Sequence, residues 1–121
     1  MSYNIILTPF FEREFKKLSK KYASLQKDLK TIINLLNENP KSGESIGNNC
    51  YKIRMSISSK NKGKSGGARI ITHIRFVNEE IFLLSIYDKS ALSNIAEEKL
   101  LIGLKVLKII KAIFCLNIGV D

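Results

Sequence analysis

One stretch of the sequence is rich in cations and contains no acid. Between Glu44 and Glu79 there is no aspartate or glutamate, although charges of both signs are usually interspersed on a protein surface. The basic residues of this window are Lys52, Arg54, Lys60, Lys62, Lys64, Arg69 and Arg75. Lysine and arginine bind phosphate oxygens through charge-assisted hydrogen bonds. The window therefore predicts an anion site, and a solvated basic face with a loose hairpin loop is the alternative interpretation.

The densest part of the window is the segment KNKGKSGGAR at Lys60–Arg69, with four cations and three glycines. A phosphate-binding loop of the Walker A type would need a glycine where Ser58 stands, and a helix after its Gly-Lys-Ser run. A dinucleotide fingerprint fails for the same reason, because its glycines must open a helix. Glycines between two strands instead let backbone amides approach phosphate oxygens while the lysines reach outward. A phosphodiester backbone fits this segment better than a small nucleotide does.

The cysteine and histidine residues of the sequence do not indicate a metal site or a disulfide. Cys50 and Cys115 lie far apart without CxxC partners, and His73 is the one histidine of the chain. Neither a zinc site nor a disulfide framework is encoded by this pattern. We interpret both cysteines as small buried hydrophobes and His73 as a structural histidine rather than a general base, and we expect no metal and no cofactor.

The residues before the cationic window predict a short strand followed by two helices. Tyr3–Leu7 suits a strand, Thr8 supplies an N-cap oxygen, and Pro9 fits the first helical position because no amide hydrogen is needed there. Apolar residues then recur at helical spacing in two runs, and the second run ends near Pro40. The first run is Phe11, Phe15, Leu18 and Tyr22, and the second is Leu25, Leu29, Ile32, Ile33 and Leu36.

The spacing of apolar residues changes from a period of about 3.6 residues to a period of 2 after a polar loop at Lys41–Asn49. Apolar Tyr51, Ile53, Met55 and Ile57 alternate with Lys52, Arg54, Ser56 and Ser58. Such alternation predicts a strand with one face in the core, so that both cations point to the other side. Two more strands, Arg69–Val77 and Ile81–Tyr87, are expected as a hairpin.

A last helix is expected from about Ser93 to Asn117, with lysines opposite a broad apolar stripe. The predicted order is β-α-α-β-β-β-α, an α+β fold in which a mainly antiparallel four-stranded sheet carries two N-terminal helices and a C-terminal helix. The length of 121 residues suits one domain over residues 1–121. Packing on the sheet or on a partner is the expected role of the last helix, and membrane-surface binding is the alternative.

The net charge of +9 favours polyanionic partners such as nucleic acid, an acidic protein or an anionic membrane. The N-terminal residues MSYNIILTPF show no secretory signal, and three lysines in the last helix argue against a membrane span. We therefore expect a cytoplasmic protein without a membrane partner.

Four segments of the second half resemble the RelE/ParE toxin superfamily of bacterial type II toxin–antitoxin systems. They are Cys50–Met55, the GKSGGxR run at Gly63–Arg69, Ile81–Ile86 and Tyr87–Ser90. The glycine-rich loop is most similar to the HigB subgroup, and the two helices are similar to the N-terminal half of the family. The resemblance covers roughly residues 3 to 100. It implies a RelE-like fold and a ribosome-dependent endoribonuclease, an mRNA interferase that inhibits translation. It also implies a toxin that is monomeric when free and hetero-oligomeric with a cognate antitoxin.

The resemblance also implies roles for particular side chains. The catalytic positions fall on Lys52, Arg54, Arg69 and Lys89, and Lys60, Lys62, Lys64 and Arg75 are expected to bind RNA or the ribosome. No metal is needed when the 2′-hydroxyl of RNA is the nucleophile. The cations would clamp the phosphate, Lys52 is also a candidate base, and Lys89 is a candidate proton donor. The structural alternatives are an exposed strand face for Lys52 and Arg54 and a simple surface position for Arg69. For Lys89 the alternative is a pairing with Asp88 or a cap on the last helix.

The sequence departs from the family pattern at one position. Some RelE-type enzymes have a tyrosine several residues beyond the last basic position, where this chain has Ile95. Tyr87 could replace it only by stacking or by bonding from another direction. A ParE-like poison of DNA gyrase without nuclease activity, and a basic RNA-binding module, therefore stay open as alternative functions.

Overall fold

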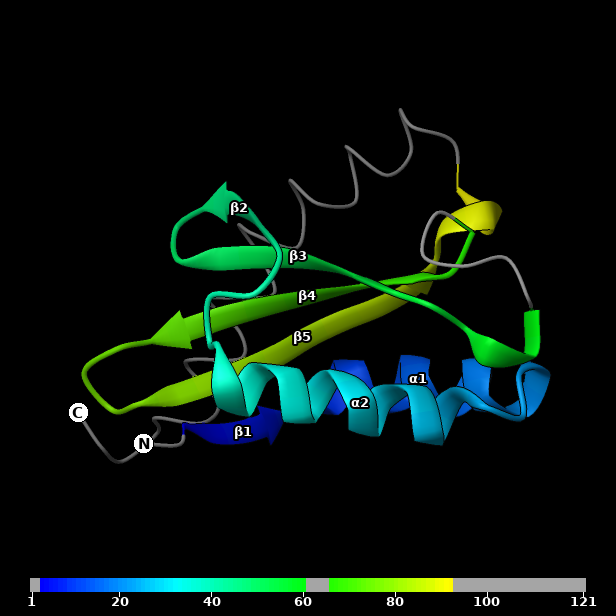
Figure 1. Ribbon diagram of the computed structural model, residues 1–121, viewed down its shortest axis with the longest axis horizontal. Coiled ribbons are helices and arrows are strands. Elements are labelled where there is room, and N and C mark those ends of the chain that lie inside the picture. Colours follow the sequence, from blue (N-terminus) through cyan, green and yellow to red (C-terminus); the bar gives the residue numbers. More distant parts are fainter. Residues whose placement is uncertain (1–2, 61–65, 93–121) are drawn as a thin grey trace.

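The computed structural model describes residues 3–60 and 66–92 of the chain (Figure 1). The described residues form β1 (Asn4–Leu7), α1 (Pro9–Lys21), α2 (Leu25–Glu38), β2 (Glu44–Gly47), β3 (Cys50–Met55), β4 (Ala68–Arg75) and β5 (Glu80–Asp88). Two short 3₁₀ turns, η1 (Ser58–Lys60) and η2 (Lys89–Ala91), follow β3 and β5. The predicted α+β class is confirmed, and the helix expected at Ser93–Asn117 lies outside the described residues.

The sheet has five strands in the order β1-β5-β4-β3-β2 rather than the four that we predicted. β1 runs parallel to β5, and the other neighbouring strands are antiparallel. The added strand is β2, which lies in the expected polar loop and pairs with β3. Asn48 and Asn49 join these strands with φ values of 55° and 61°. Two consecutive positive φ values are typical of a tight hairpin turn, so the Gly-Asn-Asn run is a turn signal within that loop.

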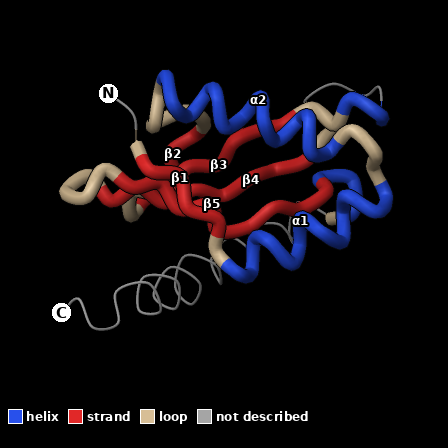
Figure 2. Tube along the Cα trace, turned by 90° about the horizontal axis from the view of Figure 1, so that it is seen from below, coloured by secondary structure: helices blue, strands red, loops and turns tan. Residues whose placement is uncertain are grey.

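Both helices cover the same face of the sheet, with α1 along β5 and α2 along β3 (Figures 1 and 2). The predicted start of α1 is confirmed, because the Phe11 amide donates to Thr8 Oγ1 at 3.3 Å. The Thr8 hydroxyl also donates to the Leu83 carbonyl oxygen at 2.9 Å, which ties the cap to β5. Neither α1 nor α2 has the length and hydropathy that crossing a bilayer requires.

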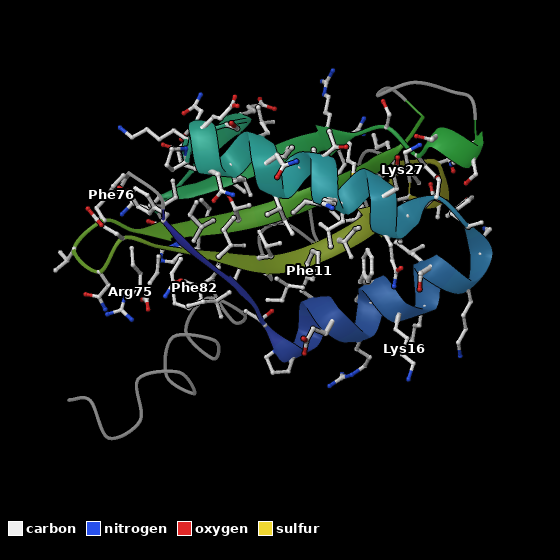
Figure 3. All side chains as sticks on the ribbon, turned by 60° about the horizontal axis from the view of Figure 1, so that its bottom comes forward. Phe11, Lys16, Lys27, Arg75, Phe76 and Phe82 are labelled. Atoms are coloured by element: carbon white, nitrogen blue, oxygen red, sulfur yellow. The ribbon has the colours of Figure 1, made fainter. Side chains whose placement is uncertain are left out.

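The main core lies between the helices and the sheet. Phe11 of α1 is fully buried there (Figure 3) and stacks on Phe15 with ring centroids 6.0 Å apart. Ile53, Met55 and Ile57 join this core, so the predicted alternation after residue 50 is confirmed. Full burial of such a side chain contributes roughly 1.5–3 kcal/mol. Alternate residues of β3 must therefore project from the opposite face of the sheet.

The opposite face carries a second buried cluster, formed by Cys50, Ile71, Phe82, Leu84 and Tyr87. Cys50 is fully buried, in agreement with its interpretation as a small hydrophobe. Cys115 lies outside the described residues. The cations of β3 project from this face because their neighbours in sequence point into the helix-covered core.

Candidate nucleic-acid interface

The register of three strands places Arg54, Arg69 and Tyr87 in one row across the sheet. Arg54 of β3 is directly opposite Arg69 of β4, and Arg69 is directly opposite Tyr87 of β5. Directly opposite residues of an antiparallel pair have Cβ atoms about 5 Å apart on the same face, and like charges in that position are destabilising. We call these three residues the cationic row. Two of the four predicted catalytic residues therefore lie side by side.

The two arginines of the cationic row differ in accessibility. Arg54 is exposed, and it takes part in no ion pair with any residue that the structure describes. Arg69 is only 4% exposed, and its Nη1 donates to the Ala68 carbonyl oxygen at 3.2 Å. Tyr87 is also buried. Arg54 is thus the arginine of the row that a ligand from solvent can contact, and Arg69 adds positive charge from a buried position.

Lys52 projects from the same face, two residues from Arg54 along β3, which corresponds to about 7 Å. It is directly opposite Glu44 of β2, and its Nζ lies 3.8 Å from Glu44 Oε1. Ion pairs with an exposed partner contribute little, about 0–1 kcal/mol, because water screens them. Lys52 can therefore exchange this carboxylate for a phosphate at small cost.

Arg75 does not belong to the cationic row. It lies six residues from Arg69 along β4, about 20 Å away, and Figure 3 shows it at the β4–β5 hairpin end of the sheet. It is directly opposite Glu80, and its Nη1 lies 3.8 Å from Glu80 Oε1. A shallow open pocket at this end is lined by Asn49, His73, Ile74, Arg75, Phe76, Val77 and Asn78.

Lys60 lies elsewhere than expected. The sequence analysis predicted that it reaches outward, but its side chain is only 11% exposed. Its Nζ lies 3.0 Å from Asp88 Oδ1 and 5.2 Å from the centre of the Tyr22 ring. The buried carboxylate and the ring face hold the ammonium inward, so Lys60 is not available at the surface. Lys62 and Lys64 lie outside the described residues.

Asp88 was not among the predicted site residues. It is 5% exposed, and its carboxylate accepts hydrogen bonds from Tyr22 Oη at 2.6 Å, Lys60 Nζ at 3.0 Å and Ser90 Oγ at 2.7 Å. Burial alone would raise the pKa of Asp88, but the hydrogen bonds from Tyr22, Ser90 and Lys60 outweigh it and lower the pKa to about 2. The sequence held no sign of this cluster, because Tyr22 and Asp88 are 66 positions apart.

Lys89 follows Asp88 directly and begins η2. Its amide donates to the Gly67 carbonyl oxygen at 3.0 Å, so its backbone is attached to the start of β4. Gly67 is required at this place, since an added Cβ would lie 2.0 Å from the Met55 carbonyl oxygen. The predicted proton donor and the end of the glycine-rich segment are therefore joined through their backbones.

His73 is buried against Cys50 and Phe82 of the second cluster, in keeping with a structural role. Its Nδ1 lies 3.5 Å from Cys50 Sγ, and its ring stacks on Phe82 at 6.4 Å between centroids. Burial lowers the pKa of His73, and the charge of Arg75 lowers it further, against a backbone hydrogen bond at Asn48 that raises it. Across the described ranges, no group of three or more His, Cys, Asp or Glu side chains could hold a metal ion.

Residues 8–115 match the protein family described as the RelE toxin of the RelE/RelB toxin–antitoxin system. The chain belongs to the RelE toxin family. This membership confirms the superfamily resemblance, and assignment to the HigB subgroup stays a prediction.

Solved structures of RelE toxins share the fold at low sequence identity. The isolated E. coli RelE toxin is 20% identical, with 82% of this chain and 96% of that chain covered and a TM-score of 0.58. The toxin chain matched in the intact E. coli RelBE toxin–antitoxin complex is also 20% identical, with 72% and 96% covered and a TM-score of 0.57. The chain matched in the RelBE2 complex from Mycobacterium tuberculosis is 15% identical, with 73% and 92% covered and a TM-score of 0.55.

Proposed function

We propose that this RelE-family toxin is an endoribonuclease that cuts messenger RNA on the ribosome and thereby inhibits translation. The single observation behind the proposal is the direct cross-strand pairing of Arg54 with Arg69. Directly opposite like charges repel each other, and together they attract an anion more strongly than one charge alone does. A phosphate of the RNA backbone has the charge and the hydrogen-bond acceptors to fill that place.

The reaction needs alignment, charge stabilisation and two proton transfers. The 2′-oxygen forms a bond to the adjacent phosphorus as the bond from phosphorus to the 5′-oxygen breaks, which leaves a cyclic phosphate and a 5′-hydroxyl. Because RNA supplies this nucleophile, the proposed chemistry proceeds without a metal. Arg54 binds the phosphate oxygens that gain charge, and buried Arg69 raises the local positive potential. Lys52 takes the proton of the 2′-hydroxyl or binds the phosphate, and Lys89 gives a proton to the leaving 5′-oxygen.

Docking on the ribosome would use cations outside the cationic row. Exposed cations cover the outer side of the helix layer, on which Figure 3 shows Lys16 of α1 and Lys27 of α2. They are Arg13, Lys16, Lys17, Lys20, Lys21, Lys27 and Lys30. We assign these residues, with Lys62, Lys64 and Arg75, to the attraction of RNA, and Lys60 is left out because Asp88 neutralises it.

A cognate antitoxin would hold the toxin inactive. Two of the similar solved structures are toxin–antitoxin complexes. A free toxin with a net charge of +9 presents a basic face that an acidic or amphipathic segment can mask. We propose a monomer in the cytoplasm when free and a hetero-oligomer with the antitoxin.

Cleavage of a defined messenger RNA on purified ribosomes tests the proposal. Arg54→Ala should lower the cleavage rate by about 10²-fold or more, because it removes a donor to the charge that develops on the phosphate. Arg69→Ala and Lys52→Ala should also lower the rate. Arg75→Ala, at the other end of β4, is the comparison for the loss of one attracting charge outside the row. It should weaken RNA attraction and lower the cleavage rate by no more than about threefold, because the charge lies so far from the row.

Three outcomes would contradict the proposal. Equal losses for Arg54→Ala and Arg75→Ala would mean that total charge, and not the cationic row, carries the activity. Intact RNA together with gyrase-trapped DNA breaks would identify a ParE-like poison. RNA binding without fragments, with a salt slope of about −0.7 per phosphate contacted, would identify a basic binding module.

A further inference from the structure

Two buried carboxylates hold the first and the last residue of the short turn η1. Asp28 of α2 accepts hydrogen bonds from the Ser58 amide at 2.9 Å and from Ser58 Oγ at 2.6 Å. The hydroxyl of Ser24 donates to Asp28 at 2.8 Å and accepts from the Ser59 amide at 2.9 Å. The start of α2 therefore fixes the first two residues of η1.

Asp88 holds the third residue of η1. Lys60 lies between the Asp88 carboxylate and the Tyr22 ring, and its Nζ also donates to Ser90 Oγ at 3.0 Å. Tyr22 is the C-cap residue of α1, and its hydroxyl donates to Asp88 Oδ2. The cluster of Tyr22, Lys60, Asp88 and Ser90 thus joins the end of α1, the end of η1 and the end of β5.

The cluster lies beside residues with proposed roles in RNA cleavage. Lys60 directly precedes segment 61–65, and Asp88 directly precedes Lys89. Asp88 is also directly opposite Ala68 of β4, one position from Arg69 and Tyr87 of the cationic row. The Lys60 side chain before segment 61–65 and the Gly67 carbonyl oxygen after it are both attached to residues around Asp88.

A purely stabilising role accounts poorly for this arrangement. The removal of a Lys–Asp pair from water costs about as much as their attraction returns, so buried ion pairs are weak contributors to stability. They fix geometry instead, since a partner that moves away leaves an unpaired buried charge. The fixed geometry here is that of Lys60, Lys89 and the start of β4.

We propose that Asp88, with Tyr22 and Lys60, is a positioning cluster that holds Lys89 and the ends of the glycine-rich segment in place beside the cationic row. Asp88 touches no substrate atom in this proposal and acts through Lys89 and Lys60. The consequence for catalysis rests on the proposed ribonuclease function, whereas the consequence for local structure does not.

Tyr22→Phe is the mildest test, because it removes one hydroxyl and keeps the ring against Lys60. We expect kcat for cleavage of ribosome-bound RNA to fall about tenfold, the size of one hydrogen bond to a charged group, while KM for the programmed ribosome stays within about twofold. Tyr3→Phe is the matched control, a half-buried tyrosine just before β1, and should change neither constant. In a Lys89→Ala background, Tyr22→Phe should cost little further activity, because the residue that it positions is gone.

Hydrogen exchange supplies a measurement that does not depend on activity. Tyr22→Phe should speed exchange of the Lys89 and Ser90 amides about tenfold, while amides in the β3–β4 ladder keep their protection. Unchanged exchange at Lys89 and Ser90, faster exchange over the whole sheet, or additive effects of Tyr22→Phe and Lys89→Ala would each overturn the positioning cluster. If the wild-type toxin cuts no RNA, the ribonuclease function fails while the exchange result still decides whether the cluster exists.

Discussion

The two ends of β4 carry the same charge in opposite surroundings. At one end Arg69 is directly opposite Arg54, and at the other end Arg75 is directly opposite Glu80. An opposite-charge pair across strands contributes roughly 0.2–1 kcal/mol to stability, and a like-charge pair is unfavourable. Glu80 accounts for the position of Arg75, whereas Arg54 and Arg69 add two charges of one sign at the same place on the sheet. The comparison teaches that the register of a basic sheet, more than its total charge, locates an anion site.

The backbone gives the same contrast between the two ends. Near Arg69, β4 begins where Gly67 approaches β3 so closely that no side chain fits. Near Arg75, the hairpin turn contains Glu79 with a φ of 54°, a conformation that glycine adopts more easily. One end therefore requires a glycine that it has, and the other tolerates a residue that is strained.

Gly67→Ala should have the largest effect on stability. Its Cβ would lie 2.0 Å from the Met55 carbonyl oxygen, so β3 and β4 must separate beside the cationic row. We expect the free energy of unfolding in urea to fall by about 3 kcal/mol, the upper end of the usual cost of overpacking. Glu79→Gly at the other end is the control, and it should change stability by no more than about 1 kcal/mol. A Gly67→Ala variant as stable as wild type would mean that the close approach of the two backbones is wrong.

The two ends should also respond to different ranges of pH. The pKa of Asp88 is about 2 in the folded state against an ordinary value of 3.8, so the ionised carboxylate stabilises the fold by roughly 2 kcal/mol relative to the protonated carboxyl. This pH-dependent difference is present above about pH 4 and lost as the pH falls toward 2. The pKa of His73 is lowered from 6.5, so stability at that end begins to decline as the pH falls below 6.5. Urea unfolding from pH 8 to pH 2 should show both steps.

Substitutions separate the two steps of this pH profile. Asp88→Asn should reduce the acid step and leave the one near neutrality, because Asp28, whose pKa is also lowered by its hydrogen bonds from Ser58 and Ser24 against the effect of burial, keeps part of the acid step. His73→Gln should remove the step near neutrality and leave the acid step. A profile in which either variant removes both steps would show that the two ends do not titrate independently.

Sequence periodicity predicted the faces of the sheet but not its cross-strand neighbours. The alternation at residues 51–58 correctly placed Lys52 and Arg54 on the side away from the core, because period-2 patterns follow from strand geometry. The pattern could not show that Arg54 faces Arg69 while Arg75 faces Glu80, since register depends on loop lengths and on the bulge between Ile71 and Thr72.

Contacts between distant parts of the chain were the main source of error. Lys60 looked like one of several loop lysines, and only the folded chain brings Asp88 and Tyr22 to it. Tyr22 looked like one more apolar residue on the stripe of α1, yet its hydroxyl is a donor to that carboxylate. Helical spacing indicates which side of a helix is buried. It does not indicate which polar group from a distant part of the chain binds a residue at the end of the helix.

The smallest expected effect tests the comparison most directly, because it concerns stability in the absence of any RNA. Arg54→Gln should raise the free energy of unfolding by a few tenths of a kcal/mol, since it relieves repulsion from Arg69, whereas Arg75→Gln should lower it by a similar amount through loss of the attraction to Glu80. Both differences should shrink in about 1 M salt, where screening acts over roughly 3 Å. Arg54→Gln should at the same time lose cleavage activity, so that one substitution strengthens the fold and weakens the site. If Arg54→Gln instead destabilises the protein as Arg75→Gln does, the arginine pair contributes to the fold, and the reason to place a phosphate beside it disappears.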